Sequence, residues 1–240
     1  MTRRDGRPTI VLFDIDGTLI RSAGIGRSSL ERALEIERGW SAALEGVILD
    51  GRTDPLIVSD AFAAHGEALS RGTFERVAAR YTQCLEAAFT SFDEGRVLPG
   101  VFELLDLLDR EPRLAVGLVT GNIEAAAKLK LEHFGLGERF TFGAYGSDGA
   151  ERAALVELAC QRSGLCGREP WVLVIGDTPS DVAAAKACGA SSVAVATGHL
   201  YGAAELAASE PSCLLDDLSD PRPILELLEL SLTAPRSNPL

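Results

Sequence analysis

One stretch near the amino terminus constrains the fold more than any other. Four consecutive apolar residues, 10–13, are followed at once by the hexapeptide Asp-Ile-Asp-Gly-Thr-Leu at 14–19. An apolar run of this length predicts a strand that is buried on both faces, as in parallel sheets covered by helices. Asp14 then stands at the carboxyl end of that strand, where open α/β sheets bind their ligands. Asp16 points the same way in extended backbone and Gly17 permits a sharp turn, so the stretch predicts a small acidic cup. The alternative is that these acids only bond to amides of the following turn.

Two further apolar runs also end in polar residues. Residues 114–119 lead into Thr-Gly-Asn at 120–122, and residues 171–175 lead into Gly-Asp at 176–177. Helical patterns separate these runs, and this alternation predicts an α/β fold with a doubly wound parallel sheet. Shorter strands are expected at 140–144, 192–196 and 213–215, and a frayed tail at 233–240.

The region 21–95 interrupts this alternation. A helical pattern begins at about Ser28, no convincing strand is found from there to about residue 92, and apolar residues recur at three- and four-residue steps from 74 to 89. Thr53 or Asp54 is expected to cap a helix that starts at Pro55, which leaves Arg52 free in the preceding loop. We therefore expect an α/β core formed by residues 1–20 and 96–240 and a small helical cap domain formed by residues 21–95.

The composition excludes several classes of partner. The net charge is −12, from 23 basic and 35 acidic residues, and this disfavours binding to nucleic acid. No apolar run reaches membrane-spanning length and no signal peptide is recognisable, so we expect no membrane partner. Five cysteines without CxxC spacing indicate reduced thiols and a cytoplasmic protein: Cys84, Cys160, Cys166, Cys188 and Cys213. The sequence does not determine the oligomeric state, although a monomer is compatible with it.

Residues that lie far apart in the sequence are expected to share one pocket. Strand carboxyl ends face one edge of such a sheet, so Asp14, Thr120 and Asp177 should meet there. A hydroxyl, Gly121 and the start of the next helix form a site suited to a phosphate oxygen. Asn122 is expected to cap this helix. The alternative is that it does only this, and that Thr120 only ends its strand. Asp148 is expected to cap a later helix, from about Gly149 to Ser163.

The motifs resemble those of the haloacid dehalogenase superfamily of phosphohydrolases. The stretches Asp-Ile-Asp-Gly-Thr-Leu at 14–19, Val-Thr-Gly-Asn at 119–122 and Gly-Asp-Thr-Pro-Ser-Asp at 176–181 are similar to its first, second and fourth motifs. The helical insertion is similar to one of its cap types, and the whole pattern resembles the phosphoglycolate phosphatase-like group. The third motif usually contains Lys, and the matching position here is Arg152. Lys128 and Lys130 are the fallback candidates for the cation of the third motif. The alternative is that both are solvated helix residues.

The resemblance implies an Mg²⁺-dependent phosphatase. Four carboxylates beside a phosphate dianion also require a cation by charge alone. The metal is expected on the carboxylates of Asp14 and Asp177 and on the backbone carbonyl of Asp16, with support from Asp181, which otherwise only complements a helix dipole. Asp14 would form an aspartyl phosphate while Asp16, protonated, gives its proton to the leaving alcohol and then acts as base. The groups expected to hold the phosphate oxygens are Thr120, Gly121, Asn122 and Arg152.

The substrate stays open at this stage. A small phosphorylated metabolite is expected, and Arg52 of the cap would contact the part of it that lies away from the transferred phosphate. The alternative for Arg52 is an ordinary solvated side chain. A sugar phosphomutase is the alternative activity, because it shares these motifs. A non-catalytic regulatory protein is the weaker alternative, because such a protein would lack a nucleophile or a metal ligand.

Overall fold

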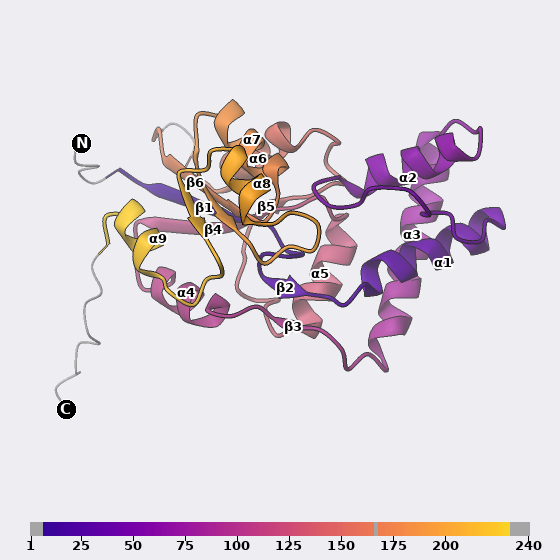
Figure 1. The fold of residues 1–240 in the computed structure, drawn as a ribbon, viewed down its shortest axis with the longest axis horizontal. Coiled ribbons are helices and arrows are strands. Elements are labelled where there is room, and N and C mark those ends of the chain that lie inside the picture. The colour runs from indigo at the N-terminus through magenta and orange to yellow at the C-terminus, as the bar shows by residue number, and fades with distance from the viewer. Residues whose placement is uncertain (1–6, 166–167, 231–240) are drawn as a thin grey trace.

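The computed structural model describes residues 7–165 and 168–230, so Cys166 and the expected frayed tail lie outside the described residues. Its centre is a six-stranded sheet in the order β5-β4-β1-β6-β7-β8, in which all pairs are parallel (Figure 1). The strands are β1 (Thr9–Phe13), β4 (Leu114–Val119), β5 (Gly143–Ala144), β6 (Trp171–Gly176), β7 (Ser191–Val195) and β8 (Cys213–Leu215). The predicted doubly wound α/β fold is confirmed.

Helices cover both faces of this sheet. They are α4 (Val101–Leu108), α5 (Glu124–His133), α6 (Arg152–Arg162), α7 (Pro179–Ala187), α8 (Ala203–Ala208) and α9 (Arg222–Leu227). Alternate residues of a strand point to opposite faces, so Val11 and Phe13 of β1 pack in one apolar cluster with α4, α5 and α9. Ile10 and Leu12 pack in the other, with α6 and α7. All four are fully buried, as the apolar run predicted.

The remaining helices form the insertion. They are α1 (Ile25–Arg38), α2 (Asp54–Ala64) and α3 (Arg71–Phe89), at the right of Figure 1, and they share an apolar cluster of their own. The chain enters and leaves through a short antiparallel ribbon of β2 (Ile20–Arg21) and β3 (Arg96–Val97). The apolar cluster also includes Ile123 and Ala126, which belong to the segment of α5. The insertion therefore packs directly on a helix of the core, while the proposed domain division stays a prediction.

Two expected helix caps are wrong. The residue before α5 is Ile123, not Asn122, and the residue before α6 is Glu151, not Asp148. The Asp148 carboxylate instead accepts hydrogen bonds from the Tyr145 amide and from Arg162. The Asn122 side chain is likewise engaged elsewhere, with Asp16, Thr120 and Lys130, so in each case other partners have replaced the capping interaction.

Other boundaries differ slightly from expectation. The strand expected at 140–144 is limited to β5, and α2 begins at Asp54 with Thr53 as its N-cap residue, although the Thr53 side chain makes no capping hydrogen bond. Each residue from 22 to 95 is described, and none lies in a strand, as expected. Among the described residues, no helix combines the length and apolar character needed to cross a membrane.

Candidate active site

Three carboxylates gather at the carboxyl edge of the sheet. Asp14 follows β1, Asp177 follows β6, and Asp181 lies in the first turn of α7. One oxygen from each lies within 4.8 Å of the others, and all three residues are buried. The structure therefore brings Asp14 and Asp177 together, as the strand-end argument predicted, and adds Asp181 from α7.

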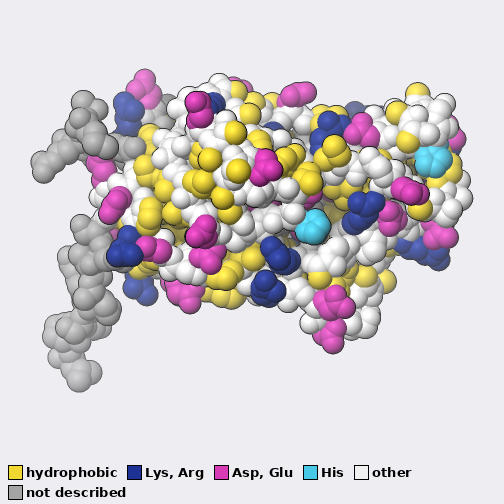
Figure 2. Space-filling model, viewed as in Figure 1, with side chains coloured by type: hydrophobic (Ala, Val, Ile, Leu, Met, Phe, Trp, Pro, Cys, Tyr) yellow, Lys and Arg dark blue, Asp and Glu magenta, His cyan; other side chains and the backbone are white. Residues whose placement is uncertain are grey.

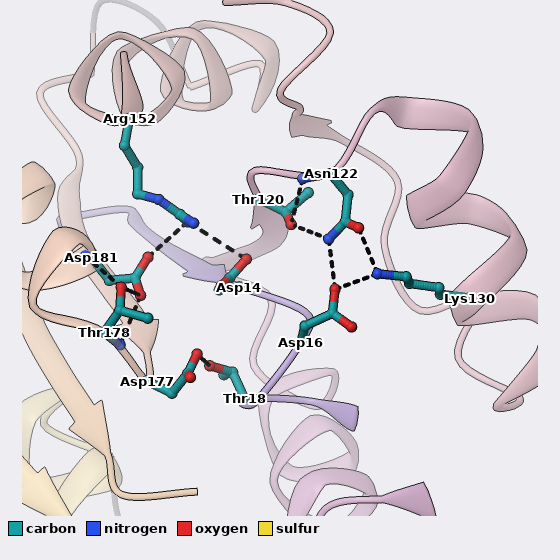
Figure 3. Close-up of polar contacts among 10 residues, drawn as sticks. All are labelled: Asp14, Asp16, Thr18, Thr120, Asn122, Lys130, Arg152, Asp177, Thr178 and Asp181. Atoms are coloured by element: carbon teal, nitrogen blue, oxygen red, sulfur yellow. Dashed lines mark hydrogen bonds and ion pairs between the residues drawn. The ribbon is translucent and has the colours of Figure 1, made fainter. Parts of the chain in front are cut away.

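The turn after β6 fixes the orientation of Asp181. Thr178 is the N-cap residue of α7, and its hydroxyl and amide donate to Asp181 Oδ2 at 2.7 and 3.1 Å. Arg152 donates to the other oxygen, Oδ1, at 2.8 Å (Figure 3). Both oxygens of Asp181 are thus already used by donors of the protein.

Arg152 is the cation of this cluster. It is the first residue of α6, its side chain is 9% exposed, and its Nη1 atom lies 3.6 Å from Asp14 Oδ1. Its Nε atom is buried and has no hydrogen-bond acceptor among the described residues. A buried guanidinium nitrogen without an acceptor is costly, so an anion that entered here would gain a hydrogen bond to it.

One arginine does not neutralise three buried carboxylates. Burial raises the pKa of Asp14 to about 6, with Arg152 opposing the rise and Asp181 adding to it. Burial, followed by repulsion from Asp14 and Asp181, raises the pKa of Asp177 well above its usual range. A cation bound among these oxygens would reduce the free-energy cost of keeping the buried carboxylates ionised. A Cβ atom at Gly17 or Gly198 would clash with Asp177 Oδ2, so two glycines leave the room that this acid occupies.

Asp16 has a different environment from the other acids. Its Oδ2 atom accepts hydrogen bonds from Lys130 Nζ at 2.6 Å and from Asn122 Nδ2 at 2.8 Å, and its Oδ1 atom accepts one from Ser22 at 2.8 Å. Burial alone would raise the pKa of Asp16, but the charge and hydrogen bond of Lys130, with the other two donors, lower it. The free protein therefore holds this carboxylate ionised.

The two lysines of α5 have opposite roles. Lys128 is exposed and pairs with Glu124 one turn earlier, as expected for a solvated helix residue. Lys130 is only 4% exposed, so the same interpretation is wrong for it. The buried residues of this region recur at positions 123, 126, 127, 130 and 131, which is the spacing of one helix face. A lysine on that apolar stripe was a signal in the sequence that pointed to a buried charge.

The segment 120–122 follows β4 and faces the acids. Thr120 is fully buried, and its hydroxyl accepts hydrogen bonds from the Asn122 side chain at 2.9 Å and from the Asn122 amide at 3.3 Å. The Asp54 amide donates to the Gly121 carbonyl at 2.8 Å, and a Cβ atom at Gly121 would clash with the Arg52 carbonyl. Glycine is therefore needed where the loop before α2 meets this segment.

These side chains line a cavity of about 540 Å³ between the sheet edge and the insertion. Arg52 is part of the lining, but it is not the free loop side chain that the sequence predicted, because it forms an ion pair with Asp60 of α2. Its buried Nε atom has no acceptor among the described residues. On the face shown in Figure 2, basic side chains are interspersed with acidic ones and form no continuous stripe.

Sequence reasoning missed several donors in the site. Thr18 donates to Asp177 Oδ1 at 3.2 Å, although it belongs to the motif that was singled out. Ser22 and Thr178 also hold carboxylates, as described above. Each is a hydroxyl within six residues of an acid, and local spacing alone does not reveal which hydroxyls turn toward the site.

The sequence model of the haloacid dehalogenase-like hydrolases matches residues 11–186. A phosphoglycolate phosphatase of Salmonella typhimurium is 30% identical over 236 residues, which cover 90% of this chain and 92% of the relative. The phosphoglycolate phosphatase of Pseudomonas putida is 29% identical over 256 residues, which cover 96% of this chain and 87% of the relative.

Solved structures share the fold. A hydrolase from Pseudomonas syringae superposes with a TM-score of 0.69 at 24% identity and covers 94% of this chain and 100% of its own. CbbY from Rhodobacter sphaeroides in complex with phosphate gives a TM-score of 0.71 at 17% identity, with coverage of 89% and 96%. The family match spans most of the chain and all three recognised motifs. The chain therefore belongs to the haloacid dehalogenase-like hydrolases, and its relatives in Salmonella typhimurium and Pseudomonas putida are phosphoglycolate phosphatases.

Proposed function

We propose that the protein hydrolyses small phosphate monoesters, with Mg²⁺, through an aspartyl phosphate on Asp14. The observation that carries the proposal is the position of Arg152 beside the carboxylates. Its buried Nε atom, which has no acceptor among the described residues, offers a hydrogen bond to an anion, while Asp14 and Asp177 offer carboxylate oxygens to a cation. A site that accepts a cation and an anion side by side fits a metal-bound phosphate group.

The residues present fit Mg²⁺. The metal would be held by the carboxylates of Asp14 and Asp177 and the backbone carbonyl of Asp16, because hard oxygen donors are the ligands that it prefers. Asp181 would support the site without binding the metal, since both of its oxygens already accept hydrogen bonds. When bound, Mg²⁺ supplies the positive charge that lowers the repulsion between a phosphate and these acids.

Two carboxylates would carry the chemistry. An oxygen of Asp14 bonds to phosphorus as the bond from phosphorus to the leaving oxygen breaks, and Asp16 gives a proton to that oxygen. Water then attacks the phosphorus and gives a proton to Asp16, and the bond between phosphorus and Asp14 breaks. Because Asp16 is ionised in the free protein, it must take up its first proton when the anionic substrate enters.

The transferred phosphate would be held by neutral and charged donors around the same cavity. These are Thr120, the amide near Gly121, Asn122 and Arg152, all of which line it. The Thr120 hydroxyl accepts hydrogen bonds from Asn122, which leaves its own proton for a phosphate oxygen. Both Nδ2 hydrogens of Asn122 already go to Thr120 and Asp16, so Asn122 would bind phosphate only by giving up one of these bonds. Fixed donors aimed at an oxyanion stabilise the transition state without reorganisation.

The cavity limits the size of the substrate. A volume of about 540 Å³ suits a small metabolite, and Arg52 would contact the part of it that lies away from the phosphate. The names of the relatives make 2-phosphoglycolate the first compound to test. A sugar phosphomutase is the alternative, and solved structures described as putative β-phosphoglucomutases share the fold, for example one from Bacteroides vulgatus with a TM-score of 0.67 at 21% identity.

The test is release of inorganic phosphate from a panel of phosphorylated metabolites in the presence of Mg²⁺. We expect turnover of at least one small phosphate monoester, with 2-phosphoglycolate first in the panel. Conversion of a sugar phosphate to its isomer, without release of phosphate, would establish the mutase instead. No turnover of any compound would favour a non-catalytic protein, although the nucleophile and the metal ligands are all present in the sequence.

A further inference from the structure

We infer that Lys130 is a positioning residue that holds the Asp16 carboxylate in place for proton transfer. The inference rests on the proposed function. It assigns to Lys130 a role that differs from both sequence predictions, which were a substitute for the phosphate-binding Arg152 and a solvated helix residue.

The contacts of Lys130 form a closed ring with two other side chains. Nζ donates to Asp16 Oδ2 at 2.6 Å and to Asn122 Oδ1 at 2.7 Å, and Asn122 Nδ2 donates to the same Asp16 oxygen at 2.8 Å. Ser22 holds the other oxygen of Asp16. Each member of the ring restricts the next, so the carboxylate has a single orientation at the wall of the cavity. Charge-assisted bonds of this length are the strong ones.

The insertion covers this ring. Lys130 reaches from α5 toward the first turn of α1, where a Cβ atom on Gly26 would lie 3.1 Å from Lys130 Nζ and 3.4 Å from the Tyr81 hydroxyl. Gly26 and Tyr81 are themselves buried. The lysine side chain is therefore 5% exposed, and its interaction with Asp16 is shielded from water. Positioning of the carboxylate thus depends on contacts from both parts of the chain.

The two buried cations of the site are divided between the two reacting acids. Figure 3 shows Arg152, from α6, beside Asp14 and Asp181, whereas Lys130, from α5, lies beside Asp16 on the opposite side. Arg152 is suited to the phosphate and Lys130 to the group that moves the proton. Loss of Lys130 should therefore slow proton transfer more than it weakens binding of the phosphate.

The experiment compares Lys130→Met with the wild-type enzyme, using 4-nitrophenyl phosphate, Mg²⁺ and rapid mixing. Nitrophenolate leaves without a proton, so phosphorylation of Asp14 needs little help from Asp16. Water must still give a proton to Asp16 when the aspartyl phosphate is hydrolysed. We expect hydrolysis of the phosphoenzyme to slow by about 100-fold, as for a catalytic group displaced by about 1 Å, while kcat/KM, which reports binding and phosphorylation, changes by less than about threefold, so that KM falls together with kcat. The variant should then release one nitrophenolate per site in a burst and accumulate phosphoenzyme.

Two further variants keep the test decisive. Lys128→Met, two residues away on the exposed face of α5, is the matched control and should behave as the wild type does. Lys130→Arg keeps the charge with a different shape, and it should recover at least about tenfold of the lost rate of hydrolysis. If Lys130→Met does not fold, the rate of phosphoenzyme hydrolysis in Lys130→Arg decides, and we expect it to be at least about threefold below that of the wild type.

The results that would overturn the inference about Lys130 can be told apart from a failure of the proposed function. An active wild-type enzyme with unchanged phosphoenzyme hydrolysis in the deciding variant would overturn the inference alone. Equal slowing of phosphorylation and hydrolysis would also overturn it, because a general loss of structure would explain both. A wild-type protein without phosphatase activity would overturn the proposed function and with it any proton transfer for Lys130 to support.

Discussion

The carboxylate of Asp54 accepts a hydrogen bond from the backbone amide of Ile123, with 2.7 Å between Oδ2 and the nitrogen. Asp54 begins α2 of the insertion, whereas Ile123 directly follows the segment proposed to bind phosphate. The Asp54 amide donates in turn to the Gly121 carbonyl at 2.8 Å. Asp54 of the insertion is therefore hydrogen-bonded to both neighbours of Asn122, Gly121 and Ile123. These bonds couple the position of the insertion to the conformation of the segment 120–122.

This contact has a cost that depends on pH. Burial raises the pKa of Asp54 from 3.8 to about 6, with Asp16 adding to the rise and Lys130 and the Ile123 amide opposing it, and the neutral Tyr81 hydroxyl also lies close by. Between pH 4 and 6 the folded protein keeps a proton that the unfolded chain loses. The protonated form of Asp54 therefore stabilises the folded protein fully below about pH 4, and this stabilisation is lost as the pH rises through 6.

Asp54→Asn removes that titration but keeps an oxygen for the Ile123 amide. We expect the free energy of unfolding of the variant minus that of the wild type to be larger at pH 7 than at pH 4 by up to about 3 kcal/mol, because only the wild type has to bury an ionised carboxylate at pH 7; this figure corresponds to about two pKa units. Urea unfolding of both proteins at both pH values measures the difference. A difference that does not change with pH would show that burial does not perturb this carboxyl.

Asp14→Asn tests the nucleophile. The amide is nearly the same size but does not form the phosphoenzyme, so turnover should fall by about 10⁴-fold or more. At neutral pH the variant should also unfold at a temperature no lower than the wild type does, because one of three crowded, buried carboxylates has been removed. Circular dichroism and trapping of the phosphorylated protein check the two parts. A variant that still becomes phosphorylated at the wild-type rate would exclude Asp14 as the nucleophile.

Mg²⁺ is tested by chelation and by thermal unfolding. Excess chelator should abolish phosphate release, and added Mg²⁺ should restore it. Binding to the folded state alone should also raise the melting temperature as Mg²⁺ is added. Asp177→Asn should remove most of that rise, because a carboxylate ligand is lost. Ser180→Ala is a useful control in the same turn. Full activity in chelator would contradict the metal role.

The sequence predicted the sheet well because its signals there are local. The run 10–13 and the strands 114–119 and 171–175 are apolar throughout, and a strand with apolar residues on both faces has few places to lie except the centre of a covered sheet. The short β5 was overestimated. Phe140 and Phe142 lie before this strand. The Phe140 ring packs against Phe13 of β1, and the Phe142 ring lies over Gly117 of β4.

The polar side chains were harder to predict, because each had several partners available. Asn122 had the correct type and position for a helix cap, yet its amide serves Asp16 and Thr120 instead. Capping propensity reflects only hydrogen bonds to nearby backbone groups. It does not account for a partner such as Asp16, which lies 106 residues away in the sequence. Arg52 has the same ambiguity. Its position in the sequence predicted that it lies near the substrate, but only the structure shows its ion pair with Asp60.

Arg52→Ala is expected to separate substrates by charge. Asp60 holds one end of the guanidinium, while the buried Nε atom has no acceptor among the described residues and the side chain lines the cavity. If that atom binds a second anion of the substrate, kcat/KM for 2-phosphoglycolate should fall by about 10- to 100-fold, a loss of about 1.5 to 3 kcal/mol. Hydrolysis of 4-nitrophenyl phosphate, which has no such anion, should change by less than about threefold.

The matched control for this prediction is Arg32→Ala. Arg32 lies on α1 of the same insertion and forms an exposed pair with Glu35, so its removal should affect neither substrate. Stability should also change little in Arg52→Ala, because the Asp60 carboxylate that loses its partner is 46% exposed and regains water. A similar loss with both substrates would indicate that Arg52 holds the insertion in place through Asp60. No loss with either would make the pair with Asp60 a surface interaction and leave recognition of the second anion to other residues of the cavity.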